Sequence, residues 1–198
     1  LAVKVLDASG SGSYSAVGSG ISYAASKGAR VINMSLGGSS PSSTLIAPLQ
    51  QAAATSVIVA AAGNSGNAFA PGYPAAYATQ TGIVGSMLIV GSVSSSNVIS
   101  SFSQTPGNGG CVASGGVTTC FKDVFLVAPG QSIYSTYKGG GYATMSGTSM
   151  ATPYVSGVAA RVLGAAPYLT NKQVVSILLQ SATDLGAAAS TATSPGKA

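Results

Sequence analysis

The residues best suited to chemistry lie between positions 146 and 157, which read Ser-Gly-Thr-Ser-Met-Ala-Thr-Pro-Tyr-Val-Ser-Gly. Ser149 falls at a predicted helix start, where free amide groups and the helix dipole stabilise an oxyanion. A serine there is equally well a plain helix cap, and the segment alone does not separate the two interpretations. It is not a Gly-x-Ser-x-Gly elbow, because Ala151 occupies the position of the second glycine.

Histidine is absent from all 198 residues. In the usual serine mechanism a neutral imidazole takes the hydroxyl proton and later returns it to the leaving group. This chain therefore cannot carry out that mechanism alone, and the source of the missing base becomes the central question.

Segments at the ends of predicted strands could assist a nucleophile. Asn64 follows a strand in Ala-Ala-Gly-Asn-Ser-Gly, where its amide could donate to an oxyanion, although alone this sequence is more typical of a turn. Two further loops, Gly10-Ser11-Gly12 and Ser35-Leu36-Gly37-Gly38, could hold an extended peptide backbone. Each of them is a plain Gly/Ser loop when considered by itself.

The elements that must position these residues alternate between strands and helices. Apolar runs predict strands at 3–6, 31–34, 57–62, 87–93 and 124–127, helices at 14–29, 41–55, 149–164 and 170–181, and a hairpin at 132–136 and 142–145. Continuously apolar strands between helices indicate a parallel sheet covered on both faces, which is an α/β fold of three layers. Sites in such sheets lie beyond the carboxyl ends of the strands.

The composition argues against several classes of function. Charged residues make up 6% of the chain, Glu is absent, and the acids are Asp7, Asp123 and Asp184. The net charge of +5 comes from scattered bases, not from the clustered basic face that nucleic-acid binding needs. No apolar run reaches the roughly 20 residues of a membrane helix. So few charges are more typical of a secreted protein, and because the chain opens in a predicted buried strand, we expect a segment before Leu1.

Cys111 and Cys120 lie nine residues apart in a Gly- and Ser-rich stretch. Zinc would need further ligands of the right kind nearby, and histidine is absent. A disulfide that closes a surface loop is therefore favoured over two free thiols, and it implies an oxidising compartment.

Five motifs follow one another along the chain: Val-Ile-Asn-Met-Ser-Leu-Gly-Gly at 31–38, Val-Ala-Ala-Ala-Gly-Asn-Ser-Gly at 59–66, Pro-Gly-Tyr-Pro-Ala at 71–75, Val-Ala-Pro-Gly at 127–130 and Ser-Gly-Thr-Ser-Met-Ala-Thr-Pro at 146–153. In this order they resemble the subtilisin-like serine proteases. The resemblance implies that residues 1–185 form the C-terminal portion of such a peptidase domain, with an inserted loop at 104–122 and a flexible tail at 186–198.

The resemblance implies roles for individual residues. Ser149 matches the nucleophile that forms an acyl-enzyme, and Asn64 matches the asparagine of the oxyanion hole, with the Ser149 amide as second donor. Tyr73-Pro74 matches a peptide bond that is often cis, and Tyr14 is expected beside the S4 pocket. The resemblance places Gly37, Gly63 and Gly72 in the wall of the S1 pocket, where glycines leave space for large apolar P1 residues. The positions that match substrate-binding segments are Gly10, Ser11, Gly12, Ser35, Leu36, Gly37, Ala62, Gly63 and Gly72.

The chain also departs from the family pattern. The family's catalytic Asp and His lie N-terminal to Leu1, and Asp7, which precedes the Gly10 loop, is not that aspartate. The resemblance implies no cofactor and no metal ligand in this chain, because calcium is expected mainly in the missing N-terminal part. A weaker cation site at 75–81 would rely on backbone carbonyls, since no Asp or Glu stands there.

Two hypotheses follow from different classes of function. The first is a secreted serine endopeptidase whose Asp and His are supplied by an N-terminal segment outside this chain. Its partners would be that segment and a peptide or protein substrate, with the role of a propeptide left open. The second is a non-catalytic peptide-binding module of the same fold. A Ser-Lys pair is a weaker third alternative, because no lysine falls near a matched catalytic position.

Overall fold

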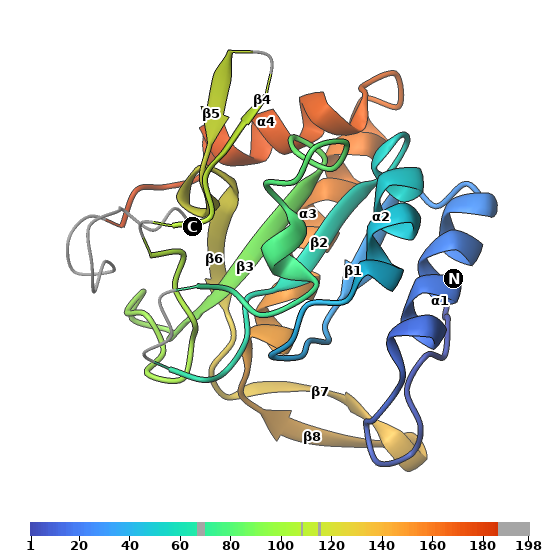
Figure 1. Ribbon diagram of the computed structural model, residues 1–198. Coiled ribbons are helices and arrows are strands. Elements are labelled where there is room, and N and C mark those ends of the chain that lie inside the picture. The colour runs from blue at the N-terminus through green and yellow to red at the C-terminus, as the bar shows by residue number, and fades with distance from the viewer. Residues whose placement is uncertain (67–69, 108, 115, 186–198) are drawn as a thin grey trace.

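The computed structural model in Figure 1 describes residues 1–66, 70–107, 109–114 and 116–185. A four-stranded parallel sheet runs through it in the order β1 (Val31–Met34), β2 (Val57–Ala61), β3 (Met87–Val93) and β6 (Phe125–Pro129). Strands β2 and β3 are buried along their whole length, which explains their continuously apolar sequence.

Helices cover both faces of this sheet (Figure 1). Helices α1 (Tyr14–Ser26) and α2 (Ile46–Ala53) pack on one face, and α3 (Thr148–Ala165) and α4 (Asn171–Ser181) pack on the other. Neighbouring strand residues alternate between the two layers, so that Ile58 joins the core under α1 and α2 while Val59 joins the core under α3 and α4. The predicted three-layer α/β fold is confirmed.

Most predicted elements are confirmed with small shifts of their ends. The predicted helix at 41–55 is shorter, because a 3₁₀ turn, η1 (Ser43–Leu45), precedes α2. The predicted strand at 124–127 begins at Phe125, directly after another 3₁₀ turn, η3 (Phe121–Val124). The predicted hairpin is formed by β7 (Ile133–Tyr137) and β8 (Gly141–Met145).

The predicted strand at 3–6 is wrong. In the described chain, residues 1–6 pair with no strand and form no backbone hydrogen bond with β1, which is the free edge of the sheet. Val5 instead packs against α1 at Gly20, where a Cβ would collide with Val5 Cγ1. The apolar run therefore covers a helix, and without a neighbouring strand to pair with it forms no ladder.

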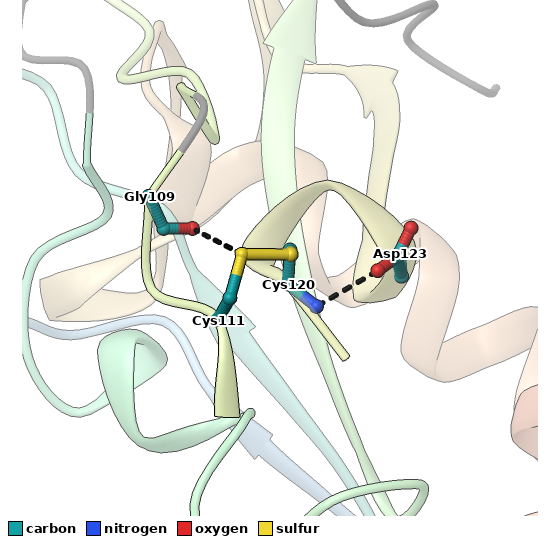
Figure 2. The surroundings of a disulfide bond; sticks show 4 residues. All are labelled: Gly109, Cys111, Cys120 and Asp123. Carbon is teal, nitrogen blue, oxygen red and sulfur yellow. Dashed lines mark hydrogen bonds between the residues drawn. A yellow bond between two sulfur atoms is a disulfide. The ribbon is translucent and has the colours of Figure 1, made fainter. Parts of the chain in front are cut away.

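The predicted inserted loop contains a small antiparallel pair, β4 (Val112–Ser114) and β5 (Val117–Thr119). The Cys111–Cys120 disulfide joins the two ends of this pair (Figure 2), which confirms the predicted bridge. Beyond it, Asp123 Oδ2 accepts a 2.8 Å hydrogen bond from the Cys120 amide. The disulfide and this bond together fix the start of η3.

Three further predictions concern single features. The Tyr73–Pro74 peptide bond is cis, as expected. The predicted tail at 186–198 lies outside the described residues. None of the helices in the described ranges is both long and apolar enough to cross a bilayer.

Candidate active site

The carboxyl end of the sheet brings together residues that are far apart in the sequence. Strand β1 leads to Ser35, β2 leads to Ala62 and the loop behind it, and α3 starts beside both. A cavity of about 560 Å³ at this end is lined by predicted site residues from all three segments, namely Leu36, Gly37, Gly63, Asn64, Gly72 and Ser149. Ala62 is buried behind the wall and accepts a 2.7 Å hydrogen bond from the Gly72 amide.

Ser149 is the second residue of α3 and is half-buried at the cavity. The helix cap is Gly147, so the interpretation of Ser149 as a plain helix cap is wrong. The amides of Met150 and Ala151 both donate to Gly147 O. Among the described residues nothing accepts from the Ser149 amide, which leaves this first-turn donor available at the cavity.

Asn64 is held by Thr148, a residue that sequence reasoning missed. Asn64 Oδ1 accepts from the Thr148 amide at 2.8 Å and from Thr148 Oγ1 at 3.1 Å. Thr148 Oγ1 in turn accepts from the Gly63 amide at 3.1 Å, and Thr148 is fully buried. Because Oδ1 is occupied by the helix start, the Asn64 amide nitrogen is the end of the side chain that remains for a ligand. Asn64 is therefore more than a turn residue.

A chain of side-chain hydrogen bonds anchors the backbone of Ser149 from the other side. Ser35 Oγ donates to Ser149 O at 2.8 Å, and Asn33 Nδ2 donates to Ser35 Oγ at 2.9 Å. Ser156, two turns along α3, donates to Asn33 Oδ1 at 2.8 Å. Sequence reasoning missed Asn33 and Ser156; the signal for Asn33 was a polar residue inside an apolar strand.

The two predicted substrate-pairing segments face a second cavity of about 460 Å³. Its lining includes Gly10, Ser11 and Gly12 from one segment and Ser35, Leu36 and Gly37 from the other. Tyr14 also lines it, and its hydroxyl donates to Ser40 O at 2.6 Å. Gly38, the next residue, is already bridged to Tyr73 by two backbone hydrogen bonds of 2.8 and 2.9 Å.

Asp7 organises the turn that carries Gly10 to Gly12. Its Oδ1 accepts from Ser9 Oγ at 2.6 Å and from the amides of Ser9 and Ser11 at 2.8 and 3.0 Å. The hydrogen bond from the Ser9 hydroxyl, followed by those from the two amides, lowers the pKa of the Asp7 carboxyl below its ordinary value of 3.8. The charged form is therefore the one that holds this loop.

The lining of the 560 Å³ cavity includes two buried residues that sequence reasoning did not single out. Gln104 and Phe121 both line it, and they stand at the two ends of the segment predicted as an inserted loop. Gln104 Nε2 donates to Ala70 O at 2.7 Å, and the Gln104 amide donates to Gly63 O at 3.0 Å. No composition or spacing signal marked them, because their role depends on where the loop returns to the sheet.

Within the described residues, no three His, Cys, Asp or Glu side chains come together as a metal site. The candidate cation segment at 75–81 fits poorly as well. The carbonyls of Ala75, Tyr77 and Gln80 accept local backbone hydrogen bonds, and Thr81 O accepts from Gln50 Nε2. With no carboxylate and with four of its seven carbonyls already engaged, the segment lacks the oxygen cage that calcium prefers.

Comparisons with known proteins identify relatives over nearly the whole chain. The Peptidase S8 model, described as the Subtilase family, matches residues 1–194. Subtilisin DY of Bacillus licheniformis is 42% identical over 189 residues, which cover 93% of this chain and 61% of that relative. Subtilisin E of Bacillus subtilis (strain 168) is 43% identical over 189 residues, which cover 93% of this chain and 44% of that relative.

Solved structures lead to the same family. A cold-adapted subtilisin-like serine proteinase matches with a TM-score of 0.77 at 35% identity, covering 98% of this chain and 63% of its own. Sphericase matches with a TM-score of 0.76 at 34% identity, covering 90% and 58%. The chain thus spans between 44% and 63% of the length of these four relatives. From its ordered motifs, its parallel sheet and these matches, the chain belongs to the subtilase family.

Proposed function

We propose that this chain forms the nucleophile and substrate-binding half of a serine endopeptidase, whose Asp and His come from an N-terminal segment outside the chain. One observation carries the proposal: the free Ser149 amide and the Asn64 side chain, held through Thr148, line the same cavity as the Ser149 side chain. Two donors and a hydroxyl around one space are the parts that acyl transfer requires.

The chemistry divides between the two segments. Ser149 Oγ forms a bond to the scissile carbonyl carbon, and its proton passes to the histidine of the N-terminal segment. The Asn64 amide nitrogen and the Ser149 backbone amide donate to the resulting oxyanion. The C–N bond then breaks, the histidine returns the proton to the leaving amine, and water hydrolyses the acyl-enzyme in the reverse sequence.

An apolar groove supports the docking of that segment. It measures about 410 Å³ and lies between Leu1, Val3 and Val5 on one side and the free edge of β1 on the other, with α1 as its floor. An extended apolar segment laid along β1 would satisfy the unpaired edge and cover these side chains. The N-terminal segment is the proposed occupant, because roughly two fifths or more of each relative's length lies outside the matched region.

A second hollow supports the same partner. It measures about 360 Å³ and lies beside Ser149, between the β7–β8 hairpin and α3. Met145 and Tyr154 line it and are 41% and 47% exposed. A catalytic base must approach Ser149 from a side that this chain leaves open, and the hollow is such a side.

Labelling with a fluorophosphonate tests the proposal. The chain is mixed with its N-terminal segment, treated with the reagent and analysed by intact-mass spectrometry and by peptide hydrolysis. We expect one adduct that maps to Ser149, and we expect Ser149→Ala to abolish both the adduct and hydrolysis, whereas Ser176→Ala on α4 leaves them unchanged. Full activity in Ser149→Ala would contradict the proposal.

The absence of histidine favours one alternative, a peptide-binding module without turnover. The two cavities would still hold an extended peptide. This alternative predicts peptide affinity that survives Ser149→Ala, together with no covalent labelling when the N-terminal segment is present. For either function we propose an extracellular location, which the Cys111–Cys120 disulfide supports because such bonds persist in oxidising compartments.

A further inference from the structure

Gln104 is a buried polar side chain that lines the 560 Å³ cavity, where the predicted S1 glycines Gly37, Gly63 and Gly72 also lie. It keeps only 9% of its surface exposed. Buried amides of this kind normally satisfy both their donor and their acceptor atoms, because an unpaired polar atom costs free energy. The orientation of the Gln104 carboxamide therefore shows which of its two polar atoms remains available to a ligand.

The surroundings fix the orientation of the Gln104 carboxamide. Nε2 faces Ala70 O at 2.7 Å, and because a carbonyl only accepts, the nitrogen must be the atom on that side. Oε1 consequently faces the opposite way, against Gly63, where any Cβ would collide with it. A Cβ built on Gly72 would lie 3.9 Å from the same oxygen. Gln104 Oε1 thus lies between two glycines of the predicted S1 wall.

No described residue donates a hydrogen bond to Gln104 Oε1. The side chains around it offer no replacement, since Gly63 and Gly72 have none and Phe121 is an apolar ring that is 8% exposed. Phe121 is held there by the adjacent disulfide and by packing against Gly110. The cavity therefore offers this neutral acceptor together with the apolar ring of Phe121.

We propose that Gln104 is a specificity-determining residue, which selects P1 side chains that are large, apolar along their length and tipped with a hydrogen-bond donor. Tyrosine is the matched probe, because it differs from phenylalanine by one hydroxyl. This inference rests on the proposed function for its biological meaning. It refines the sequence-based expectation that the pocket accepts large apolar P1 residues.

Peptide binding tests the inference independently of turnover. The full protein, with its N-terminal segment, is titrated with the product-like peptides Ac-Ala-Ala-Ala-Tyr and Ac-Ala-Ala-Ala-Phe, whose carboxylates would accept from Asn64 and the Ser149 amide. We expect tighter binding of the Tyr peptide by about three- to tenfold, which corresponds to one net hydrogen bond. The nearly isosteric variant Gln104→Met should bring the ratio to about one while affinity for the Phe peptide changes little.

A matched control separates this effect from the loss of any Gln–carbonyl hydrogen bond. Gln50 Nε2 donates to Thr81 O at 3.0 Å and does not line the cavity, so Gln50→Met should keep the Tyr/Phe ratio. Equal affinities in the wild type, a ratio unchanged in Gln104→Met, or no binding of either peptide would overturn the inference. A Gln104-dependent ratio without hydrolysis of any peptide would uphold it while contradicting the proposed function. If Gln104→Met fails to fold, equal affinities of the two peptides for the wild type would still overturn the inference.

Discussion

The carboxyl end of the sheet and the free edge at β1 differ in how completely this chain builds them. At the carboxyl end, Thr148 is fully buried and shared between Asn64 and Gly63, and the carbonyl of Ser149 accepts a hydrogen bond from Ser35. At the edge, Leu1 is 79% exposed and the β1 backbone has no partner on its outer side in the described chain.

The carboxyl end and the β1 edge differ because only the carboxyl end is held by contacts between elements of this chain. The cavity residues follow β1 and β2 or lie at the start of α3. These three elements pack together inside this chain, so the positions of the cavity residues need no outside partner. The groove at the edge has a floor and one wall formed by apolar side chains, and nothing within the described chain fills the space between them. We infer that this chain alone forms the oxyanion-binding geometry. The groove at the β1 edge, in contrast, is covered only when the N-terminal segment associates.

Asn64→Ala gives the largest expected effect and tests the site at the carboxyl end of the sheet. Loss of this donor should lower kcat by about 10²- to 10³-fold in the complex with the N-terminal segment, the magnitude known for subtilisin itself, with little change in KM. Stability should fall by about 1 kcal/mol, because the Thr148 amide at the start of α3 loses its acceptor. Steady-state kinetics and thermal unfolding measure the two quantities. A rise in KM with kcat unchanged would mean that Asn64 binds substrate rather than the oxyanion.

Leu1→Asp tests the incomplete edge. Leu1 lines the groove yet is largely exposed in the isolated chain, so the substitution should leave that chain's unfolding midpoint unchanged. Association with the N-terminal segment should weaken by about 30-fold, since a leucine that would become buried is replaced by a charge. Calorimetric titration measures the affinity. Val98→Asp, at a valine that is 51% exposed and does not line the groove, is the control and should bind normally; equal affinities in both variants would place the partner elsewhere.

Thr148→Val separates the positioning of Asn64 from the hydrogen bond that Asn64 donates to the oxyanion. Valine keeps the buried shape but removes the hydroxyl that links the Gly63 amide to Asn64. We expect kcat to fall by about tenfold, less than for Asn64→Ala, because the Thr148 backbone amide still holds Asn64. The kcat loss should also be largely absent when Thr148→Val is combined with Asn64→Ala. Additive losses in this double-mutant cycle would show that Thr148 acts independently of Asn64.

The sequence allowed the fold and the site to be predicted to different depths. Apolar runs and their spacing predicted β1, β2, β3 and the hairpin closely, because buried parallel strands leave a clear pattern. The same rule failed at residues 3–6, since an apolar run reports burial and does not report whether a partner strand is present. Ser149 and Asn64 could be identified as candidates because each lies in a short motif, and because the order of the five motifs matches the family.

The supporting contacts of the site could not be predicted from the sequence. Thr148, Asn33 and Ser156 act through hydrogen bonds across 84 to 123 positions of sequence. Gln104 reaches the cavity only because its segment returns to the β2 loop, where its amide bonds Gly63 O. Such contacts depend on tertiary packing, which has no local periodicity to reveal it.

Asp7→Asn gives the smallest expected effect and tests a loop that connects the two regions, since residues 1–6 lead into Gly10 to Gly12. The folded-state pKa of Asp7 is lowered, so its charged form stabilises the loop at pH values above the unfolded-state pKa, near 3.8. That contribution should be lost as the pH falls through the lower folded-state pKa. The wild type should therefore unfold at a slightly higher temperature than Asp7→Asn at pH 6, and the two curves should converge in strong acid. Thermal unfolding between pH 6 and 2 measures this convergence. A difference between wild type and Asp7→Asn that persists at the lowest pH would mean that the carboxylate charge does not hold the loop.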